Sequence, residues 1–239
     1  MAQEDQLINP SIHLTVKKVG REQTPIIIVD NFSNDTEQLI NYAKYRCDFT
    51  TDDSSYYPGV RSALPKTYVN AVLNMLYQTI YDVYQIPPEF LLRPRNYCFS
   101  LISHQPEQLM MLQRMPHFDT LSPNYFAILH YLGPHSHGDT GLFRHRPTNW
   151  ERIDQARSEH YFSAANAHIK QHGEPQAGYF VASDHHFELF DRIEYRPNRL
   201  VVYPGNLLHS VLIEPNKDID SDPTTGRLTA NIFVEFTNP

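Results

Sequence analysis

Residues that could bind one metal ion stand in two separate parts of the sequence. His117 and Asp119 lie two positions apart in residues 116–119. On an extended backbone both side chains point the same way, because side-chain direction repeats every second residue. Another histidine, His209, follows in the strand-like residues 199–213. These three side chains could therefore reach one ion if the fold brings the two segments together.

Two histidines and one carboxylate form the facial triad that binds non-haem Fe(II). Such a triad holds the ion from one face and leaves positions open for other ligands. A single buried histidine near a strand end is more often a hydrogen-bonded structural residue, so the prediction rests on His117, Asp119 and His209 together. The chain holds 13 histidines, a number that also favours metal chemistry.

The elements that must position these ligands are predicted as helices first and strands afterwards. Asn34 and Glu37 form a capping box for a helix that ends near Arg46. Apolar residues at helical spacing predict a second helix over residues 68–84, which Pro87 ends. Strands are predicted for residues 13–17, 25–30, 96–103, 125–132, 140–145, 178–182, 194–195, 200–203 and 226–236. This order indicates an α+β fold with the helices packed on one sheet.

Two segments interrupt the strands. Thr148 and Glu151 form a capping box for an inserted helix over roughly residues 150–171, and residues 216–226 make a polar tip between the last two strands. Neither repeats nor a linker are visible, so one domain is predicted over residues 1–239. It would comprise a helical part at about residues 30–88 and a core at about residues 90–237, with a helical insert at about residues 148–172.

Composition excludes several classes of function. The net charge of −7 argues against a nucleic-acid partner, which would need a basic surface. No apolar run reaches membrane length, and the polar residues 1–5 do not resemble a signal peptide. Cys47 and Cys98 give no disulfide framework and fit a reducing compartment. We therefore expect a cytoplasmic protein without a membrane partner. Exposed strand edges make a homodimer plausible.

Five motifs in a fixed order resemble the Fe(II)/2-oxoglutarate-dependent dioxygenase superfamily, in its prolyl-hydroxylase-like branch. That branch has His-x-Asp, a Tyr-Leu strand, a Gly-rich segment, an aromatic-Pro-x-x-x-x-His strand, and Arg or Lys two residues before Ser or Thr. The matching residues here are 117–119, 130–132, 140–143, 203–209 and 227–229. The resemblance covers about residues 96–237. Residues 57–61 and the phrase Pro-His-Phe-Asp also resemble a bacterial subgroup of the superfamily.

The resemblance implies a double-stranded β-helix (jelly roll) that binds Fe(II) through His117, Asp119 and His209. It implies that 2-oxoglutarate fills two of the open positions and O₂ the third. Arg227 would bind the far carboxylate of 2-oxoglutarate, and Thr229 and Tyr131 would hydrogen-bond the same group. The implied reaction hydroxylates an unidentified substrate, such as an amino acid, a peptide or protein residue or a small metabolite, and releases succinate and CO₂.

The sequence departs from this pattern in two gaps. The inserted helix lengthens the spacing from His117 to His209, and the polar tip lengthens the spacing from His209 to Arg227. Loops accept such insertions at little cost. The same tip offers Arg227 three acidic partners instead of a cosubstrate, namely Asp218, Asp220 and Asp222. Tyr131 and Thr229 could likewise be ordinary core residues of their strands.

Other histidines leave two further functions open. His135 and His137 have the His-x-His spacing of cupins, although a solvated turn after Gly133 and Pro134 is the simpler interpretation. The alternatives are therefore a cupin-like metal-binding protein without 2-oxoglutarate turnover and a non-catalytic jelly-roll binding protein. Two more groups are expected to be unimportant for metal binding. Residues 184–186 give a loop without a face for chelation. Residues 144–146 could line a pocket for an anionic substrate, but an exposed basic strand end is the simpler interpretation.

Overall fold

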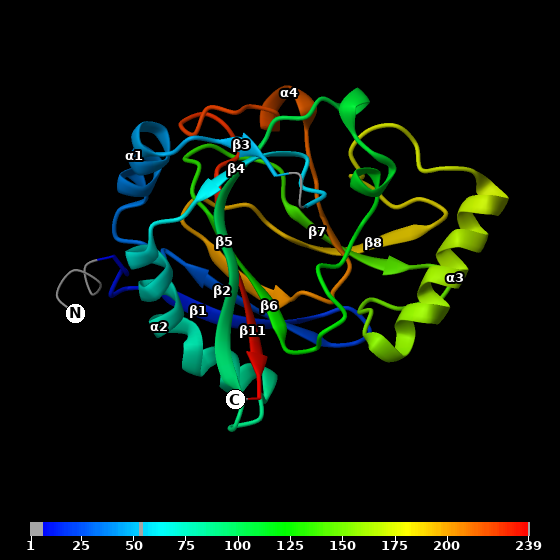
Figure 1. Cartoon of the computed structure of the whole chain (residues 1–239), viewed down its shortest axis with the longest axis horizontal. Coiled ribbons are helices and arrows are strands. Elements are labelled where there is room, and N and C mark those ends of the chain that lie inside the picture. The colour runs from blue at the N-terminus through cyan, green and yellow to red at the C-terminus, as the bar shows by residue number, and fades with distance from the viewer. Residues whose placement is uncertain (1–6, 53–54, 239) are drawn as a thin grey trace.

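Antiparallel strands build the centre of the molecule, with α1 and α2 at one end and α3 at the other (Figure 1). The computed structural model describes residues 7–52 and 55–238, so residues 1–5 lie outside it. The helices are α1 (Thr36–Arg46), α2 (Lys66–Tyr84), α3 (Gln155–His172) and α4 (Pro215–Asp218), with 3-10 turns η1 (Pro106–Gln108) and η2 (Met111–Arg114). None of the helices in this part of the chain is both long and apolar enough to cross a membrane.

The strands form a large sheet and a small sheet. In spatial order the large sheet contains β1 (His13–Val19), β2 (Thr24–Asp30), β9 (Leu200–Pro204), β6 (Tyr125–Tyr131), β11 (Thr229–Thr237), β5 (Leu91–Ile102), β4 (Gly59–Ala63) and β3 (Thr50–Thr51). The small sheet contains β10 (His209–Val211), β7 (Thr140–His145) and β8 (Phe187–Ile193). The α+β class predicted from the sequence is confirmed, with antiparallel pairing between neighbouring strands.

The central strands of the large sheet are buried on both faces. In β6, Phe126 and Ile128 pack toward α1 and α2, whereas Ala127 and Leu129 pack toward the small sheet. The strands β2 and β9 alternate in the same way. Since successive side chains point to opposite faces, a strand covered on both sides must be apolar at every position. This explains why these strands are continuous apolar runs in the sequence.

The helices α1 and α2 cover the outer face of the large sheet. From α2, Leu76 and Ile80 are fully buried in the cluster that contains Phe126 and Ile128. The hydroxyl of Tyr84, at the end of α2, lies within hydrogen-bond distance of two strand carbonyls. It is 3.0 Å from the carbonyl oxygen of Pro25 and 3.1 Å from that of Val202. The prediction that the N-terminal helices pack on one sheet is correct, and their packing leaves the inner face for chemistry.

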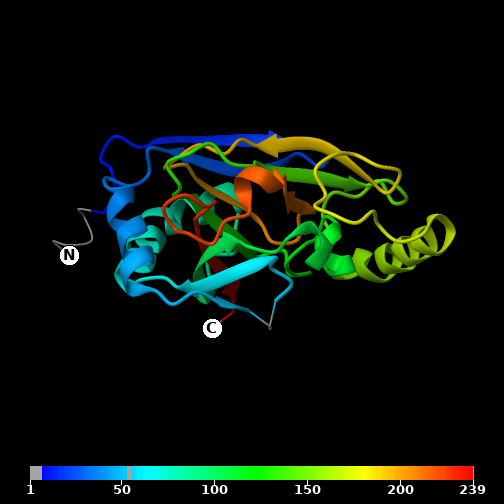
Figure 2. The ribbon, with the colours of Figure 1, turned by 90° about the horizontal axis from the view of Figure 1, so that it is seen from above.

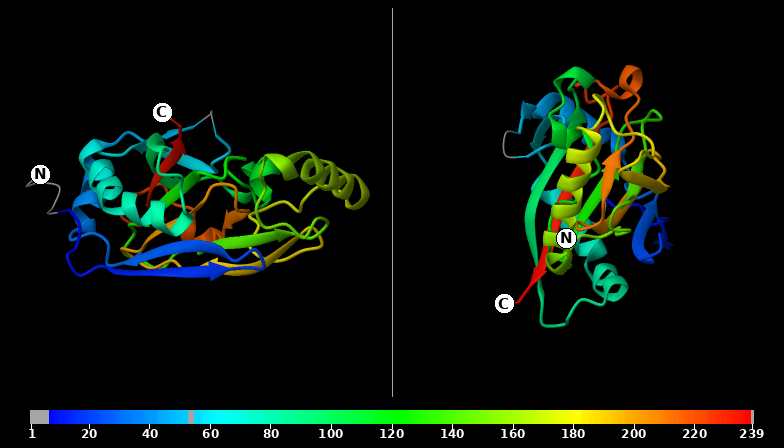
Figure 3. Two further views of the ribbon diagram at one scale, coloured as in Figure 1. Left: turned by 90° about the horizontal axis from the view of Figure 1, so that it is seen from below. Right: turned by 90° about the vertical axis from the view of Figure 1, so that its right-hand side faces the viewer.

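The small sheet lies between the large sheet and α3. Leu142 of β7 faces the large sheet, while the next residue, Phe143, joins Tyr161 of α3 and Phe187 of β8 in a third apolar cluster. Figure 2 shows the blue strands β1 and β2 and the cyan strands β3 and β4 on opposite faces of the molecule. Figures 2 and 3 both show α3 projecting at the end opposite α1. The molecule therefore contains a sheet-to-sheet layer closed by helices at both ends.

Two predicted helix starts are wrong because their capping residues serve other contacts. The first helix begins after Asp35, whose carboxylate accepts from the Gln38 amide, rather than after Asn34. The inserted helix begins at Gln155 after the N-cap Asp154, not near residue 150. Glu151 instead accepts hydrogen bonds from the Arg144 guanidinium. Local capping signals cannot reveal such tertiary partners.

Three strand predictions also need correction. Residues 178–182 form no strand, and residues 194–195 follow the end of β8, whose residues 187–193 were not predicted. The last strand starts at Thr229, so Arg227 precedes it. Strand β8 lies near the edge of the small sheet with most side chains half-buried, and therefore lacks the apolar run that marks the central strands.

A buried histidine in β6 predicts a pH-dependent stability. His130 bonds Tyr68 and Asn198 at 2.7 and 3.1 Å, and burial lowers its pKa to about 4. An unfolded histidine has a pKa of about 6.5, so its stabilisation is complete above that pH and is lost as the pH falls toward 4. We expect the free energy of unfolding to fall by up to about 1.4 kcal/mol per pH unit from this residue. Urea unfolding between pH 7 and 5 measures the slope, which His130→Gln should flatten.

The matched control is His135→Gln, at an exposed loop position. It should leave the pH slope unchanged. An equal slope in wild type and His130→Gln would show that His130 does not bind protons differently in the folded and unfolded states.

Candidate metal centre

A backbone bridge joins the two segments that carry the predicted ligands. The His117 amide donates to the His209 carbonyl at 2.9 Å, and the His209 amide donates to the His117 carbonyl at 2.8 Å. The Asp119 amide donates to the Gly205 carbonyl at 2.7 Å. The predicted strand around His117 is therefore a single antiparallel bridge beside β10. This pairing places the two imidazole rings side by side, with 4.4 Å between their centroids.

The three predicted ligands converge on one point. One ligand atom from each of His117, Asp119 and His209 lies within 4.8 Å of the other two. The Nδ1 of His209 lies 2.8 Å from the Leu207 carbonyl, which can only accept a hydrogen bond. Nδ1 therefore carries the hydrogen, and the lone pair of Nε2 faces the Asp119 carboxylate at 3.9 Å. This tautomer is the one in which a histidine can bind a metal through Nε2.

The electrostatics of the centre favour a cation. Burial lowers the pKa of His117 to about 3, and the neighbouring His209 and Arg61 lower it further. Burial raises the pKa of Asp119. Both side chains reach solvent on one side, although protein surrounds them elsewhere. His117 is therefore neutral at pH 7, as a metal ligand must be. A bound cation would also offset the cost of enclosing the Asp119 charge.

Strand register lines up polar side chains opposite this centre. Thr229 of β11 pairs with Ser100 of β5 and with Tyr131 of β6, and Ser100 pairs in turn with Arg61 of β4. Residues directly opposite on neighbouring strands share a face, and Tyr131 lies on the inner face toward the small sheet. Asn231, two residues beyond Thr229, donates to Ser100 Oγ at 2.9 Å and to Thr229 Oγ1 at 3.0 Å. The inner face thus carries a polar row within an otherwise apolar layer.

Arg227 is a buried cation near this row. Its side chain is 2% exposed, and Nε donates to the Gly138 carbonyl at 2.9 Å. The guanidinium lies 5.5 Å from the ring centres of both Tyr131 and Tyr195. Within residues 7–52 and 55–238, its Nη2 is buried and has no hydrogen-bond partner. An arginine enclosed in this way is a candidate site for an anion.

The acidic residues of the polar tip do not pair with Arg227 in the described part of the chain. Asp218 accepts instead from His137 Nδ1 at 3.0 Å, from the Gly138 amide at 3.1 Å and from the Glu214 amide at 2.8 Å. Asp220 and Asp222 accept hydrogen bonds from threonines of the same tip. The three rival partners are therefore engaged elsewhere, and Asp218 secures the loop whose carbonyl holds Arg227.

Tyr203 lies beside the ligand cluster and within electrostatic range of Arg227. Its ring is 5.0 Å from that of His209. Burial raises the pKa of its phenol well above the usual value, with a further rise from the Asp119 charge and an opposite effect from Arg227. Both charges therefore act on one hydroxyl. The sequence motif included Tyr203, but nothing in the motif indicated that this residue would be affected by both Asp119 and Arg227.

Tyr131 and Thr229 lie on the inner face, with their hydroxyls already hydrogen-bonded. Tyr131 is fully buried, and its hydroxyl lies 2.8 Å from Thr140 Oγ1. Thr229 is also buried and accepts from Asn231 at 3.0 Å. Both residues line the row beside Arg227. Their contact with a cosubstrate stays a prediction.

Arg61 was missed as a residue of the centre. Its charge lowers the pKa of both His117 and Asp119. The guanidinium stacks 4.4 Å from the Tyr57 ring centre, and Nη1 donates to Asp52 at 2.9 Å. The turn signal at residues 57–61 was visible in the sequence. Arg61 and His117 are far apart along the chain, so the sequence did not indicate that the charge of Arg61 acts on the metal ligands.

The other basic and histidine groups lie in different surroundings. His135 is exposed and His137 is buried against Asp218, so the cupin-like pair does not converge on one ion in this structure. Arg144 and His145 are 4% and 0% exposed, so the prediction of an exposed basic strand end is wrong. Arg144 is buried because Glu151 and Glu188 neutralise its charge.

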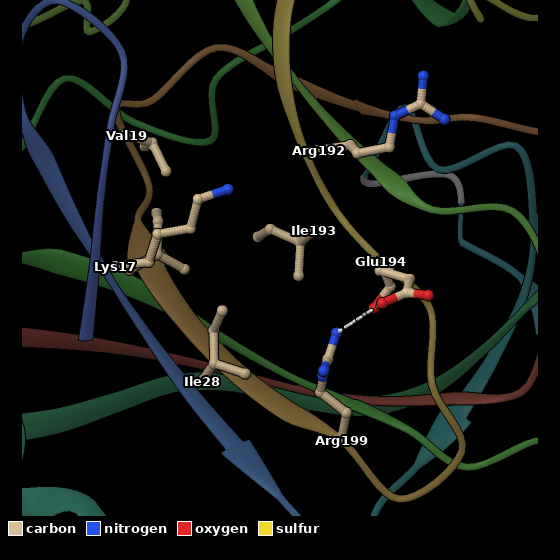
Figure 4. Close-up of a pocket in the computed structure, with 8 residues that line it drawn as sticks. Lys17, Val19, Ile28, Arg192, Ile193, Glu194 and Arg199 are labelled. Carbon is tan, nitrogen blue, oxygen red and sulfur yellow. Dashed lines mark hydrogen bonds and ion pairs between the residues drawn. The ribbon is translucent and has the colours of Figure 1, made fainter. Parts of the chain in front are cut away.

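A cavity of about 210 Å³ lies away from the ligand cluster, between β1, β2 and the end of β8 (Figure 4). Its cations are already paired. Lys17 binds Asp191 at 2.7 Å, and Arg199 binds Asp30 at 2.6 Å and approaches Glu194 at 3.8 Å. Arg192 approaches Asp139 at 3.6 Å, and Val19 and three isoleucines line the remainder. This cavity therefore offers neither a free charge nor a metal ligand set.

Residues 10–234 match the family described as "Family of unknown function (DUF6445)". No curated protein matches the chain in sequence. Similar solved structures are HygX from Streptomyces hygroscopicus with nickel, 2-oxoglutarate and hygromycin B bound (11% identity, TM-score 0.49, 92% of this chain and 87% of that chain) and AviO1 from Streptomyces viridochromogenes Tue57 (10%, 0.41, 99% and 93%). Another is an N-substituted L-amino acid dioxygenase from Burkholderia ambifaria AMMD (9%, 0.34, 88% and 81%).

HygX was solved with 2-oxoglutarate bound, and the Burkholderia protein is a dioxygenase; both are proteins that this chain is similar to. The prolyl-hydroxylase-like branch within the superfamily stays a prediction. What this chain can do must be argued from its own residues.

The Asp218 contacts generate a prediction for stability. Asp218 is fully buried and accepts from one side chain and two backbone amides. Asp218→Asn removes the charge from these bonds and turns an amide donor toward one of them. We expect the free energy of unfolding to fall by about 2–4 kcal/mol at pH 7, because hydrogen bonds to a buried charge are the strong ones. Urea unfolding measures the difference. Asp222→Asn, exposed in the same tip, should change it by less than about 0.5 kcal/mol.

Proposed function

Since the chain belongs to the family of unknown function DUF6445, we propose from its geometry that it is an Fe(II)- and 2-oxoglutarate-dependent oxygenase. It would hydroxylate an unidentified amino acid, peptide or protein residue, or small metabolite, and release succinate and CO₂. The observation that carries the proposal is the convergence of His117, Asp119 and His209 on one point, beside a polar row that contains a buried arginine.

The three converging side chains fit Fe(II) by their chemistry. Two neutral imidazoles and a carboxylate suit a facial site with open positions. His209 presents Nε2 because Leu207 fixes the hydrogen on Nδ1, and this outer contact orients the ligand. Bound Fe(II), with 2-oxoglutarate, would supply the activation of O₂. The side chains of the chain hold and orient the groups that react.

Arg227 fits the far carboxylate of 2-oxoglutarate. A buried guanidinium without a carboxylate partner is costly, and an anion that binds its unpaired Nη2 would offset that cost. Arginine can bind a carboxylate through two parallel hydrogen bonds, which also fixes its orientation. Tyr203 packs against His209 and is within electrostatic range of both Asp119 and Arg227, so it would flank an extended ligand that joins the two sites. We infer that Thr229 and Tyr131 line the same side of the ligand.

The pairing of strands supports a jelly roll. Antiparallel partners are nested along the chain, with β5 on β11, His117 on His209 of β10, β6 on β9, and β7 on β8. Successive pairs alternate between the large and small sheets, and the fourth pair, β7 with β8, lies in the small sheet. A long hairpin rolled across two sheets has this order, and it is the connectivity of a jelly roll. We propose that the core is a double-stranded β-helix with His117 and His209 on one of its pairs.

The metal ligands generate a prediction for the Fe(II) complex. Under anaerobic conditions, wild-type protein with Fe(II) and 2-oxoglutarate should develop a visible charge-transfer absorption. Asp119→Ala and His209→Ala should lose this absorption, because each variant lacks one metal ligand. Loss of a residue that only hydrogen-bonds a ligand weakens metal binding by about 10- to 100-fold, and loss of the ligand itself should weaken it more. His135→Ala is the matched control and should keep the band. An unchanged band in Asp119→Ala would contradict the assignment.

Arg227 generates a separate prediction for the cosubstrate. Arg227→Ala should still bind Fe(II), but the apparent affinity for 2-oxoglutarate should fall by about 30- to 1,000-fold, since a buried charge pair is lost. Arg227→Lys keeps the charge without the planar fork and should lie between the two. Succinate release at increasing 2-oxoglutarate measures the affinity, and circular dichroism verifies the fold.

Two results would contradict parts of this proposal. Metal binding with succinate release unaffected by Arg227→Ala would remove Arg227 from the cosubstrate site. Metal binding without any succinate release at saturating 2-oxoglutarate would favour a cupin-like or purely binding protein.

A further inference from the structure

A second group of histidines gathers at the end of α3, outside the facial ligand set. His168 and His172 stand one helical turn apart on α3, and His185 lies on the loop that leads to β8. His186 and the β7 residue His145 lie behind them. Residues at i and i+4 face the same side of a helix, an arrangement that metal-binding histidines use. The expectation that residues 184–186 lack a face for chelation considered the loop alone, whereas the fold adds a helix face beside it.

The spacing of three rings matches that of ligands around one ion. The ring centroids of His168, His172 and His185 are separated by 4.4, 4.9 and 5.1 Å. An imidazole nitrogen lies about 2.0–2.1 Å from a bound Zn²⁺, which places the centres of rings that share one ion about 4.5–5.3 Å apart. The rings of His117 and His209 in the candidate metal centre have the same 4.4 Å separation as those of His168 and His172. The three rings are thus at ligand distance from one another.

The two inner histidines do not belong to this set. His186 stacks on His168 with 13° between the ring planes and 4.2 Å between centroids. A bound ion lies in the plane of each ligand ring, so two parallel stacked rings cannot share one ion. The Nε2 of His186 is also engaged with Nε2 of His145 at 3.0 Å, and both residues are buried. His172 and His185 are exposed and His168 is half-buried, which leaves the outer three open to solution.

We propose that His168, His172 and His185 form a second metal site, for a divalent transition metal that prefers imidazole, such as Zn²⁺ or Ni²⁺. Three histidines leave one or more positions for water, so the ion would be exchangeable. The site lies on α3 and its neighbouring loop, not on the strands that carry His117 and His209. The proposal for this second site therefore does not depend on the proposed oxygenase reaction.

Two of the proposed ligands share a hydrogen bond. His168 Nε2 and His185 Nδ1 now lie 2.7 Å apart and share a hydrogen bond that a metal would replace. In the described residues, the facial set is the group whose ligand atoms already converge within 4.8 Å. Asp184 adds a negative charge close enough to act on His168.

An ion at this site would join the end of α3 to the loop before β8. The same helix carries Tyr161 and Phe162, whose rings pack 5.8 and 6.1 Å from Phe118. Phe118 stands between the ligands His117 and Asp119 in the chain. The second site would thus fix the helix that packs against the segment of the first.

Metal stoichiometry tests the proposal on the full chain. Metal-free protein is titrated with Zn²⁺ by calorimetry, and bound zinc is measured after gel filtration. We expect two ions per chain in wild type and one in the His168→Ala/His172→Ala/His185→Ala variant. The Asp119→Ala/His209→Ala variant should also bind one, through the outer histidines. His160→Ala, exposed on the same helix, is the matched control and should bind two.

The triple variant and the double variant separate this site from the proposed function. If the facial variant binds no zinc, the second site is overturned even if the wild type turns over 2-oxoglutarate. If the triple variant keeps two ions, the outer histidines are not the ligands. His172→Ala alone removes one exposed side chain and should lower the affinity of the second ion at least 10-fold with an unchanged melting temperature in the metal-free state. An unchanged affinity in that variant would also overturn the proposal.

Discussion

One pair of backbone hydrogen bonds, between His117 and His209, determines the geometry on which the candidate metal centre depends. The two residues are far apart in the chain, and neither belongs to an element that could bring them together alone. Each donates its amide to the carbonyl of the other, so their side chains emerge from adjacent positions and their rings lie 4.4 Å apart. The Asp119 amide adds a third anchor at Gly205. Because these bonds involve only the backbone, the side chains stay free to bind an ion.

The rest of the structure supplies a rigid setting for that bridge. The outer face of the large sheet is covered by α1 and α2, and the outer face of the small sheet by α3, so apolar burial stabilises the sheets from outside. The layer between the two sheets can then hold polar groups, which would destabilise the protein if this layer were its only apolar core. Arg227 is the extreme case, a buried cation held by one carbonyl and two aromatic rings. Its surroundings are maintained by the Asp218 carboxylate, which binds the Gly138 amide next to that carbonyl.

Particular residues show how far prediction from the sequence could go. The apolar runs of β2, β6 and β9 were recognisable because strands buried on both faces must be apolar throughout. Strand β8 was not, since it lies near a sheet edge and most of its side chains are half-buried. The start of α3 was misplaced because Glu151, a plausible capping residue, binds Arg144 instead. Arg61 could not be connected with His117, since only the pairing of β4 with β5 brings its strand to the inner face.

Residue identities along the chain define the metal-ligand types and their order. They also define the alternation by which the side chains of His117 and Asp119 point to the same side of an extended backbone. These properties are local, or depend on residue identity alone. Tertiary structure decided which distant segments meet: the bridge of His117 to His209, the polar row from Arg61 to Tyr131, and the approach of His185 to His168 and His172. Such contacts arise from strand register and from the packing of α3, which local spacing does not encode. Residue chemistry is therefore readable along the chain, whereas the convergence that gives it a function is a property of the fold.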